Sequence, residues 1–379
     1  MNERNNVKEF LKNNEEELYL ILKELCHIPA PSGQEDARAE YCKKKLESFG
    51  AEGVYIDEAK NVIFPINAEK SDSLTVIEAH TDTVFPDTEP MPYSDDGEII
   101  KCPGVGDDTA SLSVLLLVAK FLIENKIKPE KGLLIVCNSC EEGLGNLKGT
   151  RQIFKDFAGR VAQFMSYDAA SLKRITNACV GSVRYEVEVK TEGGHSYGAF
   201  GNKNAIYYLS KIVNSIYALD VPQIEGERTT YNVGTIEGGT SVNTIAQNAK
   251  MLCEYRSTSS AALEIMKEKF FEIFDAVRAM GVEVNVTVVG ERPSAKGVDE
   301  NEIKRMCDIV SKVQKSVTGE DSTYGSGSTD CNIPLSLGVP AVCFGVYVGG
   351  GAHTRGEWIK KSSVVPGLEI ALKTTLEFI

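Results

Sequence analysis

The chain has 379 residues, of which 42% are hydrophobic and 25% are charged, and its formal net charge is -13 at pH 7. This ordinary globular mixture excludes a fibrous or disordered protein, and the length favours two domains. A surface this acidic repels phosphate backbones, so nucleic acid is excluded as an expected partner.

The hydrophobic stretches argue against a membrane or secreted protein. The longest, Leu112–Ile123, contains Ser113 and Lys120 and is too short to cross a bilayer, so it predicts a buried helix. The charged start MNERNNVKEF lacks the apolar core of a secretory signal. We therefore expect a soluble, cytoplasmic protein without a membrane partner.

Ten cysteines are scattered singly along the chain, which favours reduced and mostly buried thiols. Cys137 and Cys140 have the C-x-x-C spacing of redox and zinc motifs. No second C-x-x-C completes a four-thiolate zinc site, so small residues at the end of a buried strand are the favoured interpretation.

The first 180 residues alternate between helical and strand-like patterns. Apolar periodicity predicts, in chain order, helices over 4–26, 36–49 and 109–125 and strands over 54–56, 61–66, 74–78 and 133–137. The last strand, LLIVC, is continuously apolar, as expected for a central strand buried on both faces. Strands that alternate with helices predict a three-layer α/β domain.

The pattern changes after about residue 180 and reverts after Pro293. In between, alternation and periodicity predict strands over 183–189, 231–236, 249–255 and 282–289 and helices over 205–219 and 261–279. This β-α-β-β-α-β order is a ferredoxin-like signature. A helix over 301–317 and a strand over 341–346 follow. We predict a larger α/β domain (1–180 and 290–379) interrupted by a small α+β domain (181–289).

Residues that ligate metals follow several predicted strands. His80 and Asp82 in IEAHTDTVF project to one side of an extended segment, so Asp82 can hydrogen-bond the imidazole and fix its tautomer. Asp107 lies in the turn GVGDDTAS, where two adjacent acids also fit a helix N-cap. Glu141 and Glu142 follow LLIVC, at the strand edge where open α/β sheets build their sites.

Two further candidates lie downstream. Asp168 ends the short apolar run in FMSYDAA, and His353 lies in the glycine-rich loop VGGGAHTRGEW. Two histidines with three carboxylates suit two zinc ions that share one bridging carboxylate. They suit calcium poorly, because histidine is a weak calcium ligand.

Six motifs occur in a recognisable order and spacing: HTDTV, GVGDD, CNSCEEGLGNLKG, YDAA, GGHS and GAHTRGEW. On these motifs, over nearly the whole chain, the sequence resembles the co-catalytic zinc aminoacylase and peptidase family. That family includes peptidase T, carboxypeptidase G, acetylornithine deacetylase and succinyl-diaminopimelate desuccinylase. The resemblance implies a three-layer zinc-peptidase catalytic domain with an inserted ferredoxin-like dimerisation or lid domain.

The resemblance also implies a ligand set with two Zn²⁺ per subunit, for which Mn²⁺ or Co²⁺ can substitute. His80 and Asp168 then hold one ion, Glu142 and His353 hold the other, and Asp107 bridges the two.

The catalytic roles follow from the same resemblance. Asp82 orients His80, and Glu141 is the general base that takes a proton from the metal-activated water and delivers it to the leaving amine. His195 of the GGHS motif stabilises the charge on the scissile oxygen. It reaches the partner subunit's site across a homodimer formed by the inserted domain.

Three positions match family contacts to substrate. Asn243 lies in GGTSVNTIA and Arg256 lies in CEYRS, where the arginine fork suits a carboxylate, although Arg256 is equally compatible with a solvated strand residue. Ser328 lies in GSGSTD, whose backbone N–H groups can hold an anionic terminus.

The residue type at Asp168 bears on the substrate. In the family, aspartate at this position accompanies aminopeptidases and dipeptidases, whereas glutamate accompanies deacylases and carboxypeptidases. We therefore predict a di- or tripeptide aminopeptidase, with an N-acyl-amino-acid amidohydrolase or carboxypeptidase as the alternative. A non-catalytic relative is disfavoured because every ligand and the base are present. A thiol redox protein built on Cys137 and Cys140 would keep its activity under chelation.

Overall fold

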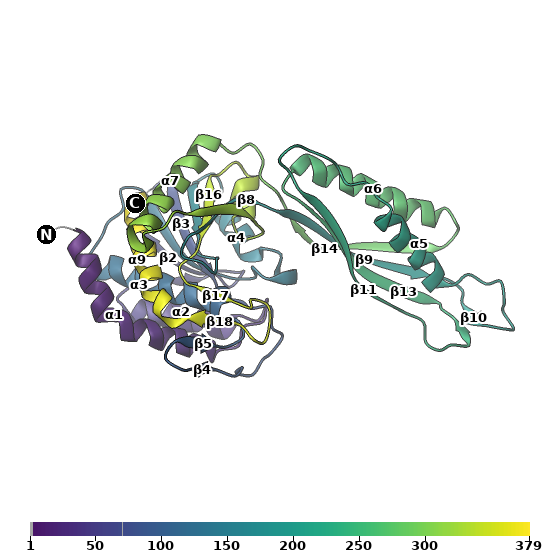
Figure 1. Cartoon of the computed structure of the whole chain (residues 1–379), viewed down its shortest axis with the longest axis horizontal. Coiled ribbons are helices and arrows are strands. Elements are labelled where there is room, and N and C mark those ends of the chain that lie inside the picture. Colours follow the sequence, from purple (N-terminus) through teal and green to yellow (C-terminus); the bar gives the residue numbers. More distant parts are fainter. Residues whose placement is uncertain (1–2, 70) are drawn as a thin grey trace. The chain divides into compact units, whose positions relative to one another are not determined.

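The computed structural model describes residues 3–69 and 71–379, which form two compact units (Figure 1). The first unit comprises Met1–Cys179 and Lys296–Ile379, and the second comprises Val180–Ala295. The second unit is therefore an insertion within the sequence of the first.

The first unit is built on an eight-stranded sheet with the order β1-β2-β6-β3-β7-β16-β8-β15. Its central pairs β6–β3, β3–β7 and β7–β16 are parallel. The strands are β1 (Tyr55–Ile56), β2 (Val62–Ile66), β3 (Leu74–His80), β6 (Gly132–Asn138), β7 (Val161–Ser166), β8 (Arg174–Cys179), β15 (Thr323–Gly327) and β16 (Ala341–Phe344). The ends of β3, β6 and β7 therefore meet at one edge, where the predicted ligands lie.

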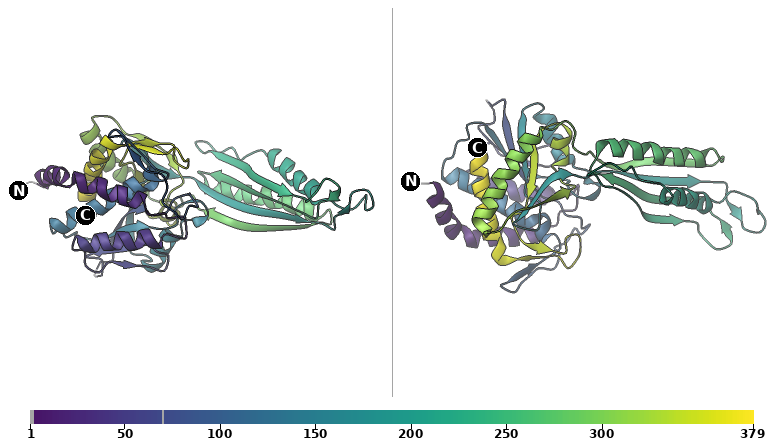
Figure 2. Two further views of the ribbon diagram at one scale, coloured as in Figure 1. Left: turned by 90° about the horizontal axis from the view of Figure 1, so that it is seen from below. Right: turned by 45° about the horizontal axis from the view of Figure 1, so that its top comes forward.

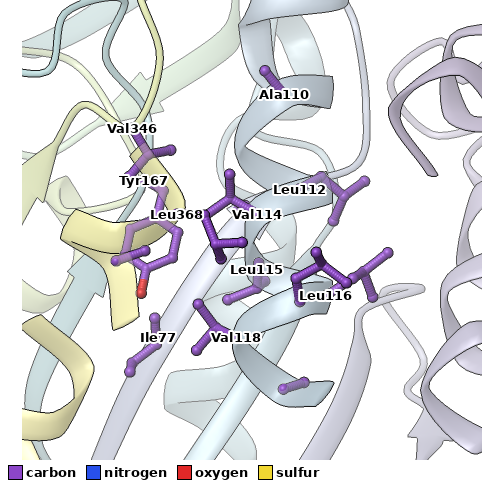
Figure 3. Close-up of a cluster of buried hydrophobic side chains, with 14 of the residues drawn as sticks. Ile77, Ala110, Leu112, Val114, Leu115, Leu116, Val118, Tyr167, Val346 and Leu368 are labelled. Carbon is purple, nitrogen blue, oxygen red and sulfur yellow. The ribbon is translucent and has the colours of Figure 1, made fainter. Parts of the chain in front are cut away.

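Helices cover both faces of this sheet. As a consequence, β3 and β6 are buried along their whole length. Those that contact one another or the sheet include α1 (Glu3–Cys26), α2 (Asp36–Ser48), α3 (Ser111–Glu124), α4 (Lys148–Asp156), α7 (Glu300–Thr318), α8 (Asn332–Ser336) and α9 (Val364–Phe378). Figure 3 shows α3 packing through Val114 and Val118 toward Ile77 of β3 and Leu368 of α9. The predicted three-layer α/β fold is confirmed.

A smaller four-stranded sheet, ordered β17-β18-β5-β4, borders the first unit's site. Its strands are β4 (Ser94–Asp95), β5 (Ile99–Lys101), β17 (Gly349–Gly350) and β18 (Trp358–Lys360). β5 leads to the Asp107 turn, and the loop between β17 and β18 carries His353, so this sheet brings two distant chain segments together. Among the described residues, no helix is long and apolar enough to span a membrane.

The second unit has one four-stranded antiparallel sheet, ordered β11-β13-β9-β14, and two helices that contact each other and the same strands (Figure 2). Its elements are β9 (Gly181–Lys190), β10 (Gly194–His195), α5 (Ala205–Tyr217), β11 (Thr229–Gly238), β12 (Thr244–Ile245), β13 (Asn248–Ser257), α6 (Ser260–Arg278) and β14 (Glu283–Arg292). With the short β10–β12 pair set aside, this is the predicted ferredoxin-like order, in which alternate residues of β9 and β13 bury against the helices.

Some elements carry no clear signal in the sequence. β15 reads TYGSG, whose last three residues are poor strand formers, and it pairs in parallel with β8. α9 contains Gly367, because a Cβ atom there would lie 1.5 Å from the Val346 carbonyl oxygen. This close backbone approach explains a glycine that weakens the helical pattern.

Candidate metal centre

His80, the last residue of β3, is fixed on both sides of its ring. The carbonyl oxygen of Asp82 lies 3.0 Å from Nδ1 and can only accept, so Nδ1 carries a proton. The other ring nitrogen, Nε2, lies 2.9 Å from Asp107 Oδ1. Burial alone would lower the pKa of His80, but Asp107 and Asp82 raise it well above its ordinary value. Asp82 therefore sets the tautomer that directs Nε2 into the cluster.

Asp107 is shared by two histidines. Its Oδ1 faces His80, and its Oδ2 lies 3.1 Å from His353 Nε2. His353 Nε2 is also 3.1 Å from Glu142 Oε1. Burial opposes ionisation of Asp107, but hydrogen bonds from His353 and His80 lower its pKa. One carboxylate that faces a different imidazole with each oxygen has the arrangement of a bridging ligand.

Glu142 joins the same group. Ligand atoms of His80, Asp107 and Glu142 all lie within 4.8 Å of one another. Burial raises the pKa of Glu142 to about 7, against the lowering effect of the hydrogen bond with His353. A cation beside a buried carboxylate of this kind would stabilise its ionised form.

Asp168 is not among the three residues whose ligand atoms lie within 4.8 Å of one another, and strand pairing places it near them. Ser166 of β7 pairs with Glu78 of β3, and the next N–H, that of Tyr167, donates to the Glu78 carbonyl oxygen at 3.1 Å. Continuing this register places Asp168 beside His80. Burial and the negative charge of Asp107 raise the pKa of Asp168 well above its ordinary value.

The carboxylate of Asp82 is buried and has a second task that sequence reasoning missed. Its Oδ1 and Oδ2 each accept a backbone N–H at 2.9 Å, from Glu141 and Glu142 respectively. Ser32 Oγ donates to Oδ2 at 2.5 Å. Burial opposes ionisation, but hydrogen bonds from His80, Ser32 and the Glu142 N–H lower the pKa of Asp82. Asp82 therefore fixes Glu141 and Glu142 as well as His80.

Asp330 is a further buried acid that was not predicted. Its Oδ2 accepts from Asn138 Nδ2 at 2.6 Å, and its Oδ1 accepts from the Thr150 hydroxyl. Burial, followed by the negative charge of Glu141, raises the pKa of Asp330 to about 7. Asp330 ties the GSGSTD loop, and Ser328 with it, to the end of β6.

Glu357 was also missed, although it lies in the quoted GAHTRGEW segment. It is buried, and its carboxylate accepts N–H groups from Gly104, Gly106 and Asp107. Burial raises the pKa of Glu357 to about 7, and these hydrogen bonds act in the opposite direction.

No side-chain cap hydrogen bond forms from the Asp107–Asp108 pair to α3, which begins at Ser111, so the N-cap alternative is not observed.

The remaining predicted residues lie in the second unit. His195 of β10 pairs with Thr244 of β12, and the Ser196 N–H donates to the Asn243 carbonyl oxygen at 3.0 Å. His195 and Asn243 are therefore neighbours, and both are exposed. Arg256 lies near the other end of β13, where its Nε is 2.7 Å from Glu254 Oε1.

The thiol alternative finds no support. All ten cysteines are free and buried. A hydrogen bond with Cys42 and burial raise the pKa of Cys137 well above its ordinary value, and burial raises that of Cys140 to about 12. A reactive redox thiol requires a lowered pKa.

The donor set fits a pair of zinc ions. Ligand atoms about 2.0–2.1 Å from a tetrahedral zinc lie roughly 3.3 Å apart. The contacts of Asp107 with His80 and His353, at 2.9 Å and 3.1 Å, are close to that spacing. Imidazole nitrogens and carboxylate oxygens are also donors that zinc prefers.

The fold and this cluster define a two-unit α/β protein with a candidate dinuclear metal centre. The sequence pattern of peptidase family M20/M25/M40 matches residues 76–377, and the chain belongs to this family. It is therefore an amide-bond hydrolase of peptides or acylated amino acids, in a family that is typically metal-dependent. The family and enzyme class predicted from the sequence are confirmed.

Individual relatives span nearly the whole chain. A succinyl-diaminopimelate desuccinylase of Corynebacterium glutamicum is 25% identical over 349 residues, covering 89% of this chain and 90% of its own. The aminopeptidase PepT of Bacillus cereus has a TM-score of 0.73 at 22% identity, covering 95% of this chain and 98% of its own. A tripeptidase of Staphylococcus aureus has a TM-score of 0.76 at 21% identity, covering 95% and 97%.

Proposed function

We propose that this enzyme is a dinuclear zinc aminopeptidase that removes the amino-terminal residue from di- or tripeptides. The observation that carries the proposal is the Asp107 carboxylate, which faces His80 with one oxygen and His353 with the other. The aspartate at position 168 and the structural likeness to an aminopeptidase and a tripeptidase support the peptide substrate.

The proposed ligands divide into two sets around Asp107. His80 and Asp168 would hold one ion, Glu142 and His353 would hold the other, and Asp107 would belong to both sets. When bound, such a pair supplies Lewis acidity and lowers the pKa of a water molecule, and Mn²⁺ or Co²⁺ can replace Zn²⁺. Asp82 keeps His80 Nε2 directed at the ion and holds the backbone of the adjacent acids.

Glu141 is the proposed general base. Its side chain is buried, and its backbone N–H is fixed by Asp82 at 2.9 Å, directly before the ligand Glu142. A carboxylate held beside a ligand can take the proton of the attacking water and return it to the leaving amine.

His195 is the proposed donor to the scissile oxygen. Its Nδ1 accepts the N–H groups of Tyr197 at 3.3 Å and Gly198 at 3.2 Å, so in the neutral ring the proton lies on Nε2. An exposed Nε2–H of fixed orientation is suited to stabilise a developing negative charge.

We further propose that His195 acts on the site of a second subunit. Asn248 begins β13, shortly after the segment with Asn243 that pairs with His195. Arg256 lies eight positions further along β13, a distance of about 27 Å on an extended strand. A tripeptide spans at most about 11 Å. This span supports the proposal that His195 and Arg256 contact one substrate from different copies.

The surface of the second unit supports a homodimer. β11 is an edge strand of ten residues, and an edge strand can pair with another chain. Ile236 on this strand is 56% exposed, and Tyr207 and Tyr217 of α5 are exposed at a similar level.

The free thiols of all ten cysteines support the cytoplasm as the proposed compartment.

A second function is an N-acyl-amino-acid amidohydrolase, favoured by the likeness to the desuccinylase. The zinc-loaded enzyme should be assayed on a free tripeptide, on the same tripeptide with an acetylated amino terminus, and on N-acetyl- and N-succinyl-amino acids. We expect kcat/KM for the free peptide to exceed the others at least about tenfold, because a recognised ammonium group is lost on acylation. A preference for the acylated amino acids would replace the peptidase with the amidohydrolase.

A further inference from the structure

The turn that carries Asp107 is held by a single buried carboxylate. Glu357 Oε2 accepts the Gly104 N–H at 2.7 Å. Glu357 Oε1 accepts the N–H groups of Gly106 and Asp107, both at 2.8 Å. The last of these hydrogen bonds fixes the backbone of the residue whose side chain faces both histidines.

Each glycine of this turn lets another group approach the backbone closely, which is the Glu357 carboxylate at Gly106 and Thr83 at Gly104. A Cβ atom at Gly106 would lie 3.0 Å from Glu357 Oε1 and 2.9 Å from the ring of Tyr347. At Gly104, which has φ 77°, a Cβ atom would lie 2.6 Å from Thr83. Tyr347 and Glu357 are 3% and 2% exposed, so the contact is dry and its geometry is determined by packing.

Glu357 belongs to the loop that carries His353. The loop closes through a Thr354 N–H bond to the Gly351 carbonyl oxygen at 3.0 Å and a Glu357 N–H bond to the Thr354 carbonyl oxygen at 3.3 Å. One carboxylate therefore attaches the Asp107 turn to the His353 loop, although about 250 residues separate them in sequence. Its three charge-assisted hydrogen bonds are of the stronger kind.

We propose that Glu357 is a positioning residue that sets the spacing between Asp107 and His353, and so the geometry of the shared metal pair. The inference depends on the proposed function, because it takes Asp107 as the bridging ligand. Glu357 itself contacts backbone N–H groups of the turn, and it acts on the centre through Asp107.

The substitution Glu357→Gln tests this role with little change of shape. A glutamine oxygen can accept from Gly106 and Asp107, but its NH₂ group would face the Gly104 N–H, donor against donor. Glu357→Asp keeps the charge but shortens the reach. The matched control is Glu369→Gln, which removes an acid that pairs with Lys373 on α9.

Zinc alone should be titrated into each metal-free protein against a competing chelator. For Glu357→Gln we expect zinc affinity to fall about 10- to 100-fold, the usual effect of losing an outer partner of a ligand. The Co²⁺-loaded variant should show altered visible absorption bands at full occupancy, and kcat should fall with KM nearly unchanged. Glu369→Gln should match the wild type in each measurement.

The outcomes separate this inference from the proposed function. Wild-type zinc affinity and an unchanged Co²⁺ spectrum in Glu357→Gln would overturn the positioning role and leave the dinuclear centre intact. Failure of the wild-type protein to bind two ions would instead overturn the proposed function. Should Glu357→Gln not fold, Gly106→Ala provides the second variant, because its methyl group would displace the same carboxylate and should shift the Co²⁺ bands in the same way.

Discussion

The two units hold most of their predicted site residues in opposite ways, and the exception is His353 of the first unit, whose side chain is 55% exposed. In the first unit the acids Asp82, Glu141 and Glu142 are buried at strand ends, and carboxylate-to-backbone hydrogen bonds cross between distant elements. In the second unit His195 and Asn243 are exposed, in and beside the short β10–β12 pair, and their contacts are with residues close in sequence or in the paired segment.

The difference agrees with the tasks that the proposed function gives to each unit. Metal ligands must be held within a few tenths of an ångström, which requires dry, cross-linked surroundings. A residue that meets substrate from a neighbouring copy must remain on a surface. Apolar side chains beside His195 follow the same pattern, because Tyr197 and Phe200 are both 90% exposed.

Removal of the metals should have the largest effect and should distinguish the two units. Chelation should reduce amide hydrolysis to background, and Zn²⁺, Mn²⁺ or Co²⁺ should restore it, because only the metals activate the water. Hydrogen exchange should accelerate at the Asp107 turn and the loop 351–357, and remain unchanged in β9 and β13. Hydrolysis that persists in metal-free protein would contradict the proposed chemistry.

Glu141→Gln should have the next largest effect. Removing the general base should lower kcat about 10²- to 10⁴-fold, while metal analysis still finds two equivalents, because Glu141 is not a proposed ligand. Asp107→Asn is the informative companion, since it should lose metal as well as activity. Normal turnover by Glu141→Gln would show that another group takes the proton.

His195→Ala should lower kcat about 10²- to 10³-fold, the usual cost of losing one donor to a developing oxyanion. Both metals should remain bound, because the substitution lies in the second unit. Loss of metal from this variant would contradict the division of tasks between the two units.

Mixed dimers sharpen the same point. When inactive His195→Ala and Glu141→Gln subunits are exchanged at equal concentration, half of the dimers are mixed and each contains one complete site. About a quarter of wild-type activity should therefore return if His195 acts across the dimer. No recovery, with subunit exchange verified by mass spectrometry, would place His195 in the site of its own subunit.

The smallest expected effect concerns stability in the first unit. Asp330 has a folded-state pKa of about 7, above the ordinary value of 3.8, so its contribution is fully present at low pH. This contribution is lost as the pH rises from about 4 to 7. Asp330→Asn has no such titration, so the unfolding free energy of its metal-free form should decline less over that range. Urea unfolding of both proteins at several pH values measures the difference. The same pH dependence of the unfolding free energy in both proteins would contradict the prediction.

The sequence alone determined the residue types and the order of the elements. LLIVC and VRYEVEV predicted β6 and β9 because burial on two faces and burial on one face leave different patterns. The family motifs predicted the residues that gather at the ends of β3 and β6. Metal binding depends on the donor atoms of the side chain, and these are fixed by the residue type.

Only the tertiary structure decided how those residues are held. The hydrogen bonds of Asp82 to Glu141, of Asp330 to Asn138 and of Glu357 to the Asp107 turn join segments far apart in the chain. A local pattern carries no record of such contacts, since a buried acid and an exposed one have the same letter. Burial, strand register and close backbone approach, at Gly106 and Gly367 for example, become visible only when the chain is folded.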